Sequence, residues 1–131
     1  MPPLPVPNSF DKILDSVALV HLATIGPDGR PQVNPIWFVR EGEHILFSVK
    51  DGTQKLLNIQ RDPHIALSFS DLENPGRYLE LRGAVVSIDL YEDLDFVNIL
   101  ARKYTGTDFS GGKVGEKRFK LTFAADRWTG Q

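Results

Sequence analysis

A lysine at the start of a short basic helix is the first residue in the sequence with clear chemical potential. Thr53 and Lys55 follow a polar loop at Lys50–Gly52, and the pattern predicts a helix over Gln54–Gln60. The free N–H groups of a first helical turn, the helix dipole and an ammonium group together suit a phosphate. No Gly-rich phosphate loop or dinucleotide motif is present, so a solvated surface lysine is the alternative interpretation.

The segment Asn34-Pro35-Ile36-Trp37 is the second candidate. Pro35 has no N–H for a β-ladder, so neighbouring backbone groups are free to face the heteroatoms of a planar ring. Trp37 offers an aromatic face that stacks on such a ring or walls a pocket. An edge strand with a tryptophan in the core explains the same residues, and the residues alone favour that interpretation.

Other chemistries find less support in the sequence. The absence of cysteine excludes disulfides, thiolate metal sites and a cysteine nucleophile. The histidines lack metal-ligand spacing, so no metal site is predicted, and the strand serines lack a nucleophile-elbow pattern. These residues are His21, His44, His64, Ser48, Ser68 and Ser70. Arg77, which follows the turn Pro75-Gly76, is either a ligand for an anion at a subunit contact or a solvated loop arginine.

Composition limits the range of partners. The 131 residues include 15 basic and 17 acidic side chains, a formal charge of −2, so no nucleic-acid partner is predicted. A hydrophobic content of 41% indicates a folded chain, and the apolar runs are shorter than the roughly 20 residues of a membrane span. Residues 1–8 read as an extended proline-rich arm without the features of a secretory signal, and we expect a cytoplasmic protein.

Strands and short helices are expected to position these residues within one domain, 9–131. Alternating apolar residues predict strands at 18–25, 30–40, 44–49, 64–70, 77–88 and 118–123. Helical spacing predicts helices at 9–16, 54–60 and 89–104, with N-caps at Ser9, at Thr53 or Asp51, and at Asp89. Gly26-Pro27-Asp28-Gly29 predicts a tight turn, and Gly83 a bulge or a close backbone approach. The pattern indicates a small, mostly antiparallel barrel filled by its own side chains, with any ligand on the outside.

Several motifs, in this order and spacing, resemble those of the pyridoxamine 5′-phosphate oxidase-like split-barrel flavoproteins. The similarity runs from about Phe10 to Trp128 and is closer to the actinobacterial branch that uses the deazaflavin coenzyme F420. The motifs are Leu22-Ala23-Thr24-Ile25 with Asp28-Gly29-Arg30-Pro31, Asn34-Pro35-Ile36-Trp37-Phe38, Lys55-Leu56-Leu57-Asn58-Ile59-Gln60-Arg61-Asp62-Pro63, and Glu80-Leu81-Arg82-Gly83-Ala84-Val85.

The resemblance implies a mainly β fold, a six-stranded, antiparallel, Greek-key-like split β-barrel with a few flanking helices. Residues 9–131 would form the cofactor-binding domain of a homodimer whose two cofactor sites lie at the subunit interface. The residues along the tricyclic ring would be Gln32, Val33, Asn34, Pro35, Ile36 and Trp37. Ser48, Val49 and Lys50 would flank the ribityl chain. Thr53, Lys55 and Asn58 would hold the phosphate, with Arg61 and Arg77 near the phosphate or the anionic tail.

The function implied by the resemblance is hydride transfer between F420 and a small unsaturated or quinone-like substrate, catalysed by an oxidoreductase. The alternatives are an FMN-dependent oxidase or reductase of the same fold, and a non-catalytic protein that binds F420, a flavin or haem. Flavin-using members often place a basic residue just before the lysine, where this chain has Thr53-Gln54, and this departure favours F420. No catalytic residue or physiological substrate is assigned; solvent, Tyr78 and a histidine are the candidate proton sources.

Overall fold

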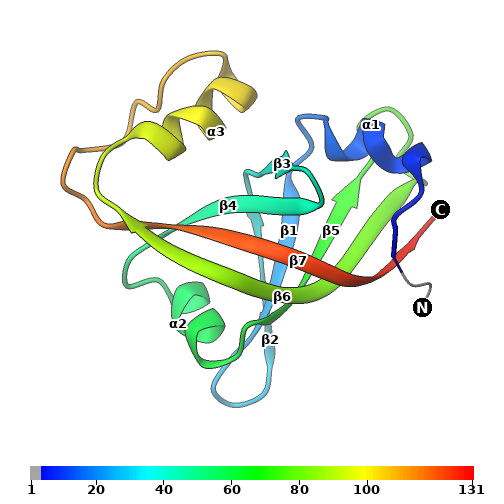
Figure 1. Cartoon of the computed structure of the whole chain (residues 1–131), viewed down its shortest axis with the longest axis horizontal. Coiled ribbons are helices and arrows are strands. Elements are labelled where there is room, and N and C mark those ends of the chain that lie inside the picture. The colour runs from blue at the N-terminus through cyan, green and yellow to red at the C-terminus, as the bar shows by residue number, and fades with distance from the viewer. Residues whose placement is uncertain (1–3) are drawn as a thin grey trace.

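Seven antiparallel strands form one curved sheet in the computed structural model, which describes residues 4–131 (Figure 1). Their order across the sheet is β2-β1-β5-β6-β7-β4-β3. The strands are β1 (Val20–Ile25), β2 (Pro31–Ile36), β3 (Val39–Glu41), β4 (His44–Lys50), β5 (His64–Ser70), β6 (Tyr78–Tyr91) and β7 (Arg118–Gly130). Residues 1–3 of the predicted N-terminal arm lie outside the described residues.

The two edge strands of the sheet, β2 and β3, are consecutive in the chain and separated only by Trp37 and Phe38. The sheet therefore curls until its edges approach each other, yet no β2–β3 ladder closes it within residues 4–131. The prediction of one strand at 30–40, interrupted at its prolines, is wrong in the place of the break, which lies at Trp37 and Phe38. The side chain of Phe38 is fully buried, and its N–H donates to the Tyr104 hydroxyl at 3.3 Å. This break turns the six predicted strands into seven and leaves the barrel split.

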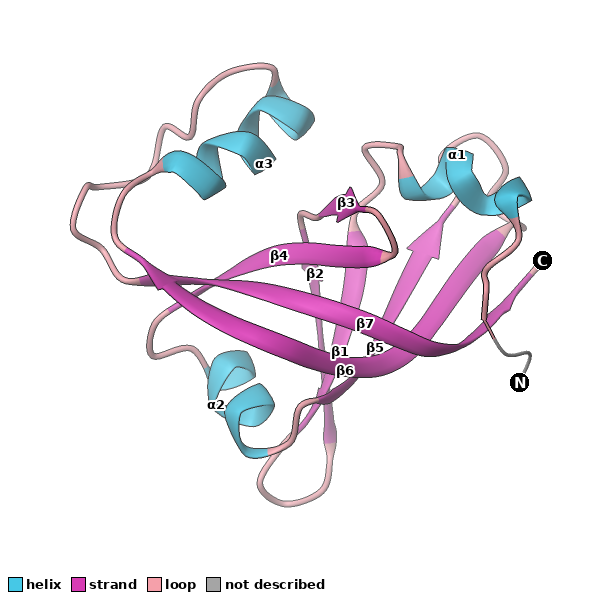
Figure 2. Ribbon diagram, in the orientation of Figure 1, coloured by secondary structure: helices cyan, strands magenta, loops and turns pink. Residues whose placement is uncertain are grey.

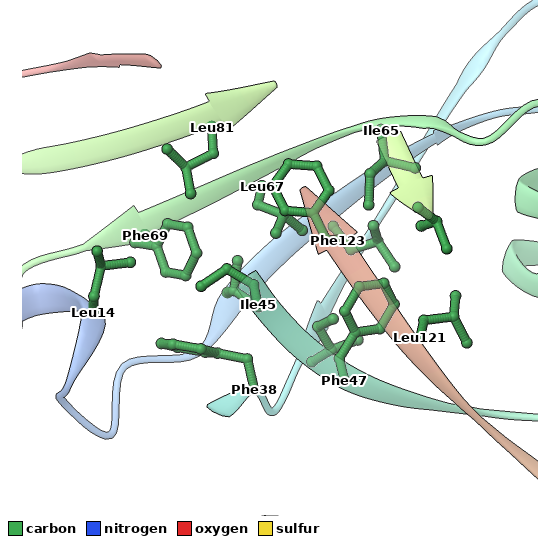
Figure 3. Packing of buried hydrophobic residues seen from close by; sticks show 14 of the residues in the cluster. Leu14, Phe38, Ile45, Phe47, Ile65, Leu67, Phe69, Leu81, Leu121 and Phe123 are labelled. Carbon is green, nitrogen blue, oxygen red and sulfur yellow. The ribbon is translucent and has the colours of Figure 1, made fainter. Parts of the chain in front are cut away.

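Apolar side chains at alternate strand positions fill the inside of the sheet. Figure 3 shows Phe47 of β4, Phe69 of β5 and Phe123 of β7 among the residues that pack together there. Phe38 completes this group, with its ring edge-to-face on Phe69 at a centroid distance of 4.9 Å. Burial of each such side chain contributes about 1.5–3 kcal/mol. Because hydrocarbon fills the interior, a ligand must bind on the outer surface.

Four short helices lie around the ends and edges of the sheet (Figure 2). They are η1 (Asn8–Phe10), α1 (Asp11–Leu14), α2 (Gln54–Arg61) and α3 (Asp95–Thr105). The predicted helix at 54–60 is confirmed, with Thr53 at the N-cap position, although its hydroxyl donates to the carbonyl oxygen of Lys50 at 2.9 Å instead of capping an N–H. No helix in the described part of the chain is long and apolar enough to cross a membrane.

Two predicted helix starts are wrong. Asp89 does not cap a helix, because residues 89–91 continue β6 and pair with residues 118–120 of β7, so α3 begins only at Asp95. Ser9 is not an N-cap either; it lies inside the 3₁₀ turn η1, and α1 is a single turn that ends at Leu14. In both places tertiary pairing and packing outweigh the local capping signal.

The ribbon formed by β6 and β7 is longer than predicted and contains two irregularities, one at Arg82/Gly83 and one at Val85/Ser87. A Cβ atom at Gly83 would lie 2.1 Å from the carbonyl oxygen of Ala124, so only glycine fits there. The predicted bulge and close approach at Gly83 are thus confirmed. The tight turn before β2 is confirmed as well, with the Gly26 N–H donating to the Arg30 oxygen at 2.8 Å.

Candidate functional site

β2, which carries most of the predicted ring-binding residues, is an edge strand of the sheet. It pairs with β1 on one side, where Pro35 lies opposite His21, and no strand of residues 4–131 lies on its other side. The side chains of Val33 and Pro35 are exposed, whereas those of Gln32 and Asn34 are half-buried. An edge strand leaves alternate backbone N–H and C=O groups without ladder partners. β2 therefore presents unpaired backbone groups beside an exposed face.

A chain of amide side chains connects β2 to α2 and includes Asn58. The Asn58 amide nitrogen donates to Thr24 Oγ1 at 3.0 Å and to Gln32 Oε1 at 3.3 Å, and Gln32 in turn donates to Asn34 at 2.8 Å. The Asn58 oxygen accepts from Gln54 at 2.8 Å, and the whole residue is inaccessible to solvent. Since an amide has only two N–H donors, Asn58 has none left for a phosphate. In this structure Asn58 braces α2 against β1 and β2, and its predicted contact with a phosphate stays a prediction.

Lys55 lies in the first turn of α2, half-buried and with its ammonium group unpaired. Burial lowers the pKa of Lys55, and no hydrogen bond or ion pair within the described residues compensates for that burial. The N-terminus of α2 also has no side-chain cap, so its first N–H groups are open. An unpaired cation beside open helical N–H groups is the arrangement that binds a phosphate. The geometry at Lys55 therefore fits the phosphate proposed for it.

Four predicted cofactor residues meet in a pocket of about 180 Å³ on the outer face of the sheet, next to α3. They are Ile36, Trp37, Ser48 and Lys50; the remaining lining residues are Val97, Leu100, Phe109 and Arg118. Figure 1 shows α3 above β4. The pocket is lined by residues of α3 and of the strands, so it lies between the helix and the sheet. The pocket thus combines an apolar wall with two cationic side chains.

Aromatic contacts fix the position of Trp37 in this pocket. Its ring stacks on Tyr104 with a centroid distance of 5.3 Å and an interplanar angle of 7°, and it meets the edge of Phe109 at 6.4 Å. The Tyr104 hydroxyl donates to the carbonyl oxygen of Ala18 at 2.7 Å, and burial raises its pKa to about 12. A tyrosine held neutral in this way keeps Trp37 in place at all physiological pH values.

The strand β4 divides its predicted ribityl-binding residues between two faces. Ser48 lies on the outer face, where its hydroxyl is 2.5 Å from the Tyr91 hydroxyl, and burial raises the pKa of Tyr91. Lys50 is exposed on the same face. Val49 is only 2% exposed and points into the barrel core. Because side chains alternate along a strand, only the backbone of Val49 faces the side of the sheet on which Ser48 and Lys50 lie, and its predicted place beside the ribityl chain stays a prediction.

The two arginines predicted near the phosphate lie apart. Arg61 closes α2, and its guanidinium donates to the carbonyl oxygen of Ile25 in β1. Arg77 precedes β6 at the opposite end of the sheet from α2, where it donates to the carbonyl oxygen of Ser9 and covers the Phe10 ring at 4.6 Å (Figure 1). Within one chain, Arg77 and Lys55 therefore do not form one site.

Arg118 is the charged residue among the four pocket residues that the sequence prediction missed. It is only 5% exposed, and it lies opposite Lys50 of β4 and Tyr91 of β6 in the sheet. Its only local signal is a charged residue at the start of an otherwise apolar, alternating strand. Placing it in the pocket requires the register of strands that are distant in sequence.

A larger pocket, of about 510 Å³, lies elsewhere, between the N-terminal arm and the β3–β4 turn. Arg40 lines it and binds Asp11 at 2.8 Å and Asp15 at 2.7 Å. None of the predicted cofactor residues lines this pocket. Its size alone does not connect it to the candidate site.

Comparisons with a family profile and with solved structures agree with the fold described above. The sequence profile described as pyridoxamine 5′-phosphate oxidase matches residues 7–130. A solved structure described as an F420 reductase is 34% identical with a TM-score of 0.86, and the match covers 95% of this chain and 98% of that one. No curated protein matches the chain.

Two more distant structures share the fold alone. The conserved hypothetical protein Rv2991 from Mycobacterium tuberculosis is 21% identical with a TM-score of 0.73, and the match covers 98% of this chain and 85% of that one. The General Stress Protein 26 from Bacillus anthracis str. Sterne is 14% identical with a TM-score of 0.68, covering 94% and 91%. Matched over nearly its whole length, the chain belongs to the pyridoxamine 5′-phosphate oxidase family, and its predicted resemblance to the F420 branch is confirmed.

Proposed function

We propose that this protein is an oxidoreductase that binds F420 and reduces a small unsaturated or quinone-like substrate. The observation that carries the proposal is the unpaired, half-buried Lys55 at the uncapped N-terminus of α2. The 34% identity to an F420 reductase favours F420 over FMN as the cofactor. Thr53 and Gln54, which precede Lys55, supply no second cation, and a phosphodiester requires less charge than a terminal phosphate.

The chemistry of these residues fits each part of such a group. Lys55 and the first N–H groups of α2 would hold the phosphate. Ser48 and Lys50 would flank the ribityl chain, and the open edge of β2 from Gln32 to Trp37 would face the ring. When bound in its reduced form, F420 would supply the hydride from its C5 position. The contribution of the protein is then to orient the ring and to exclude water from one of its faces.

A homodimer with cofactor sites at the subunit interface is part of the same proposal. Val33 is 60% exposed on β2 and Leu57 is 51% exposed on α2, so apolar surface flanks the candidate site. A second subunit over this surface would bury these side chains and enclose the ring. Arg77, which does not meet Lys55 within one chain, is proposed to reach the anionic tail in the site of the other subunit.

Titration of the purified protein with F420 and with FMN, followed by fluorescence quenching, tests the cofactor choice. We expect F420 to bind at least about 10-fold more tightly than FMN, a difference of about 1.4 kcal/mol. FMN binding in the micromolar range without F420 binding would overturn the proposal in favour of a flavin enzyme. Tight F420 binding with no turnover of any quinone or enone would instead identify a non-catalytic F420-binding protein.

A further inference from the structure

We propose that the pocket beside α3 binds a single-ring organic acid, or a ligand group of that size, through a carboxylate or phosphate oxygen held by Arg118. Ile36, Trp37, Ser48 and Lys50 of this pocket are also proposed cofactor contacts, whereas Arg118 is not one of them. The inference stands on the pocket itself and does not depend on F420 being the cofactor.

The guanidinium of Arg118 is buried and only partly paired. Its Nη2 donates to Glu116 Oε2 at 2.8 Å, whereas its Nη1 is buried without a hydrogen-bond partner among the described residues. A buried N–H group without an acceptor is unfavourable, so nearly all such groups in proteins find one. Nη1 is covered in this structure, but Arg118 lines the pocket, so a small shift of the guanidinium toward the pocket would let an oxygen atom of a ligand accept from Nη1.

Positive charge at the pocket exceeds negative charge among its closest ionised groups. Glu116 Oε2 is shared by two cations, since it lies 2.8 Å from Arg118 Nη2 and 3.3 Å from the ammonium of Lys50. The nearby hydroxyls of Ser48 and Tyr91 bind each other and carry no charge. Two cations and one carboxylate leave an excess positive charge that attracts an anion. A guanidinium donor also suits the geometry of carboxylate and phosphate oxygens.

The apolar wall of the pocket sets the size and shape of the rest of the ligand. Trp37 and Phe109 provide aromatic surfaces, and Ile36, Val97 and Leu100 complete the wall. A cavity of about 150 Å³ holds benzene in another protein, so the volume of about 180 Å³ suits one substituted ring. Phe109 also lies over the guanidinium, with its ring centroid 5.5 Å from Arg118 Cζ.

Two ligands could present an anionic oxygen to Arg118. One is a substrate with a carboxylate, and the other is the cofactor with its anionic tail. Benzoate serves as the probe for the first source, and F420 for the second. Binding of inorganic phosphate shows whether the charged end of the pocket holds an anion that makes no contact with the apolar wall. Binding of each probe to the full chain is measured by calorimetry in the wild type and in three variants.

The variants separate anion binding from structural support. Arg118→Met should weaken benzoate or F420 binding by at least about 10-fold, because it removes a charge-assisted hydrogen bond. Glu116→Gln should strengthen binding of the same probe several-fold, because it removes the carboxylate that competes for Arg118 and Lys50. Lys117→Met, a change at an exposed neighbouring lysine, should leave the affinities within about twofold of the wild type.

The probes that lose affinity in Arg118→Met show whether the bound acid belongs to the substrate or to the cofactor. Loss of benzoate binding alone assigns the acid to the substrate, whereas loss of F420 binding alone assigns it to the cofactor tail; either supports the inference. Equal affinities of wild type and Arg118→Met for all three probes, or no binding of any probe, would overturn it. If Arg118→Met does not fold, an unchanged affinity in Glu116→Gln is the overturning result. Arg118-dependent benzoate binding without F420 binding would reject the proposed function but keep this site.

Discussion

Replacing Asn58 with alanine tests whether the amide chain between α2 and β2 holds the candidate site together. The side chain of Asn58 is inaccessible to solvent and binds Thr24, Gln32 and Gln54. Thr24 is only 1% exposed, so its hydroxyl loses its partner without gaining access to water. Gln32 and Gln54 are more accessible, and both amides are free to turn toward solvent after the change.

The expected loss in the free energy of unfolding follows from these contacts. Leaving the Thr24 hydroxyl buried and unpaired costs about 1–3 kcal/mol. Losing the two hydrogen bonds to the accessible glutamines costs about 0.5–1.5 kcal/mol each, partly recovered by hydration. We therefore expect Asn58→Ala to lower the free energy of unfolding by about 2–4 kcal/mol.

Urea unfolding followed by circular dichroism measures this loss. Gln60→Ala is the matched control, because Gln60 is exposed on the same helix and should change stability by less than about 0.5 kcal/mol. A double-mutant cycle with Thr24→Val should show a coupling of about 1 kcal/mol, since replacing both partners removes the unpaired hydroxyl. A loss below about 1 kcal/mol for Asn58→Ala, equal to that of the control, would refute the bracing role.

Two further predictions concern the frame around the site. Gly83→Ala should lower the free energy of unfolding by about 1–3 kcal/mol, because its Cβ would lie 2.1 Å from the Ala124 oxygen. Gly76→Ala is the control, because its Cβ would lie 3.5 Å from the nearest atom. Equal stabilities of the two variants would contradict the prediction. Burial lowers the pKa of Lys103 from 10.5 to about 8, so above pH 8 the unfolded chain binds more protons and stability should rise toward pH 10.5. Lys103→Met should flatten that rise in thermal melts, and an unchanged slope would rule out the burial of this ammonium group.

Local sequence signals predicted the elements whose boundaries are set locally. β5 has the predicted bounds His64–Ser70, because its apolar residues alternate and Pro63 blocks the preceding helix. The end of β6 was not predictable in this way, because Asp89 and its acidic neighbours carry a helix-start signal. Pairing with β7 decides the structure there, and that pairing depends on a segment about 30 residues further along the chain.

The residues of the candidate site also divide into those with a local sequence signal and those placed by contacts between distant segments. Lys55 and Pro35 were singled out because a helix start and a proline in a strand are local features. The sequence does not show that both N–H donors of Asn58 bind side chains from β1 and β2. The alternation of Val49 with Ser48 does show in the sequence that their side chains lie on opposite faces of β4. Arg118 was missed because its place between β4 and β6 follows only from the strand register.

The F420 affinity of a Lys55→Ala variant tests the central claim most directly. Loss of a charge-assisted hydrogen bond to phosphate should weaken binding by about 1–3 kcal/mol, which is roughly 5- to 150-fold. Lys12→Ala, at an exposed lysine paired with Glu73, is the matched control and should bind F420 like the wild type. The account predicts a selective loss at Lys55, and equal F420 affinities in the two variants and the wild type would contradict it.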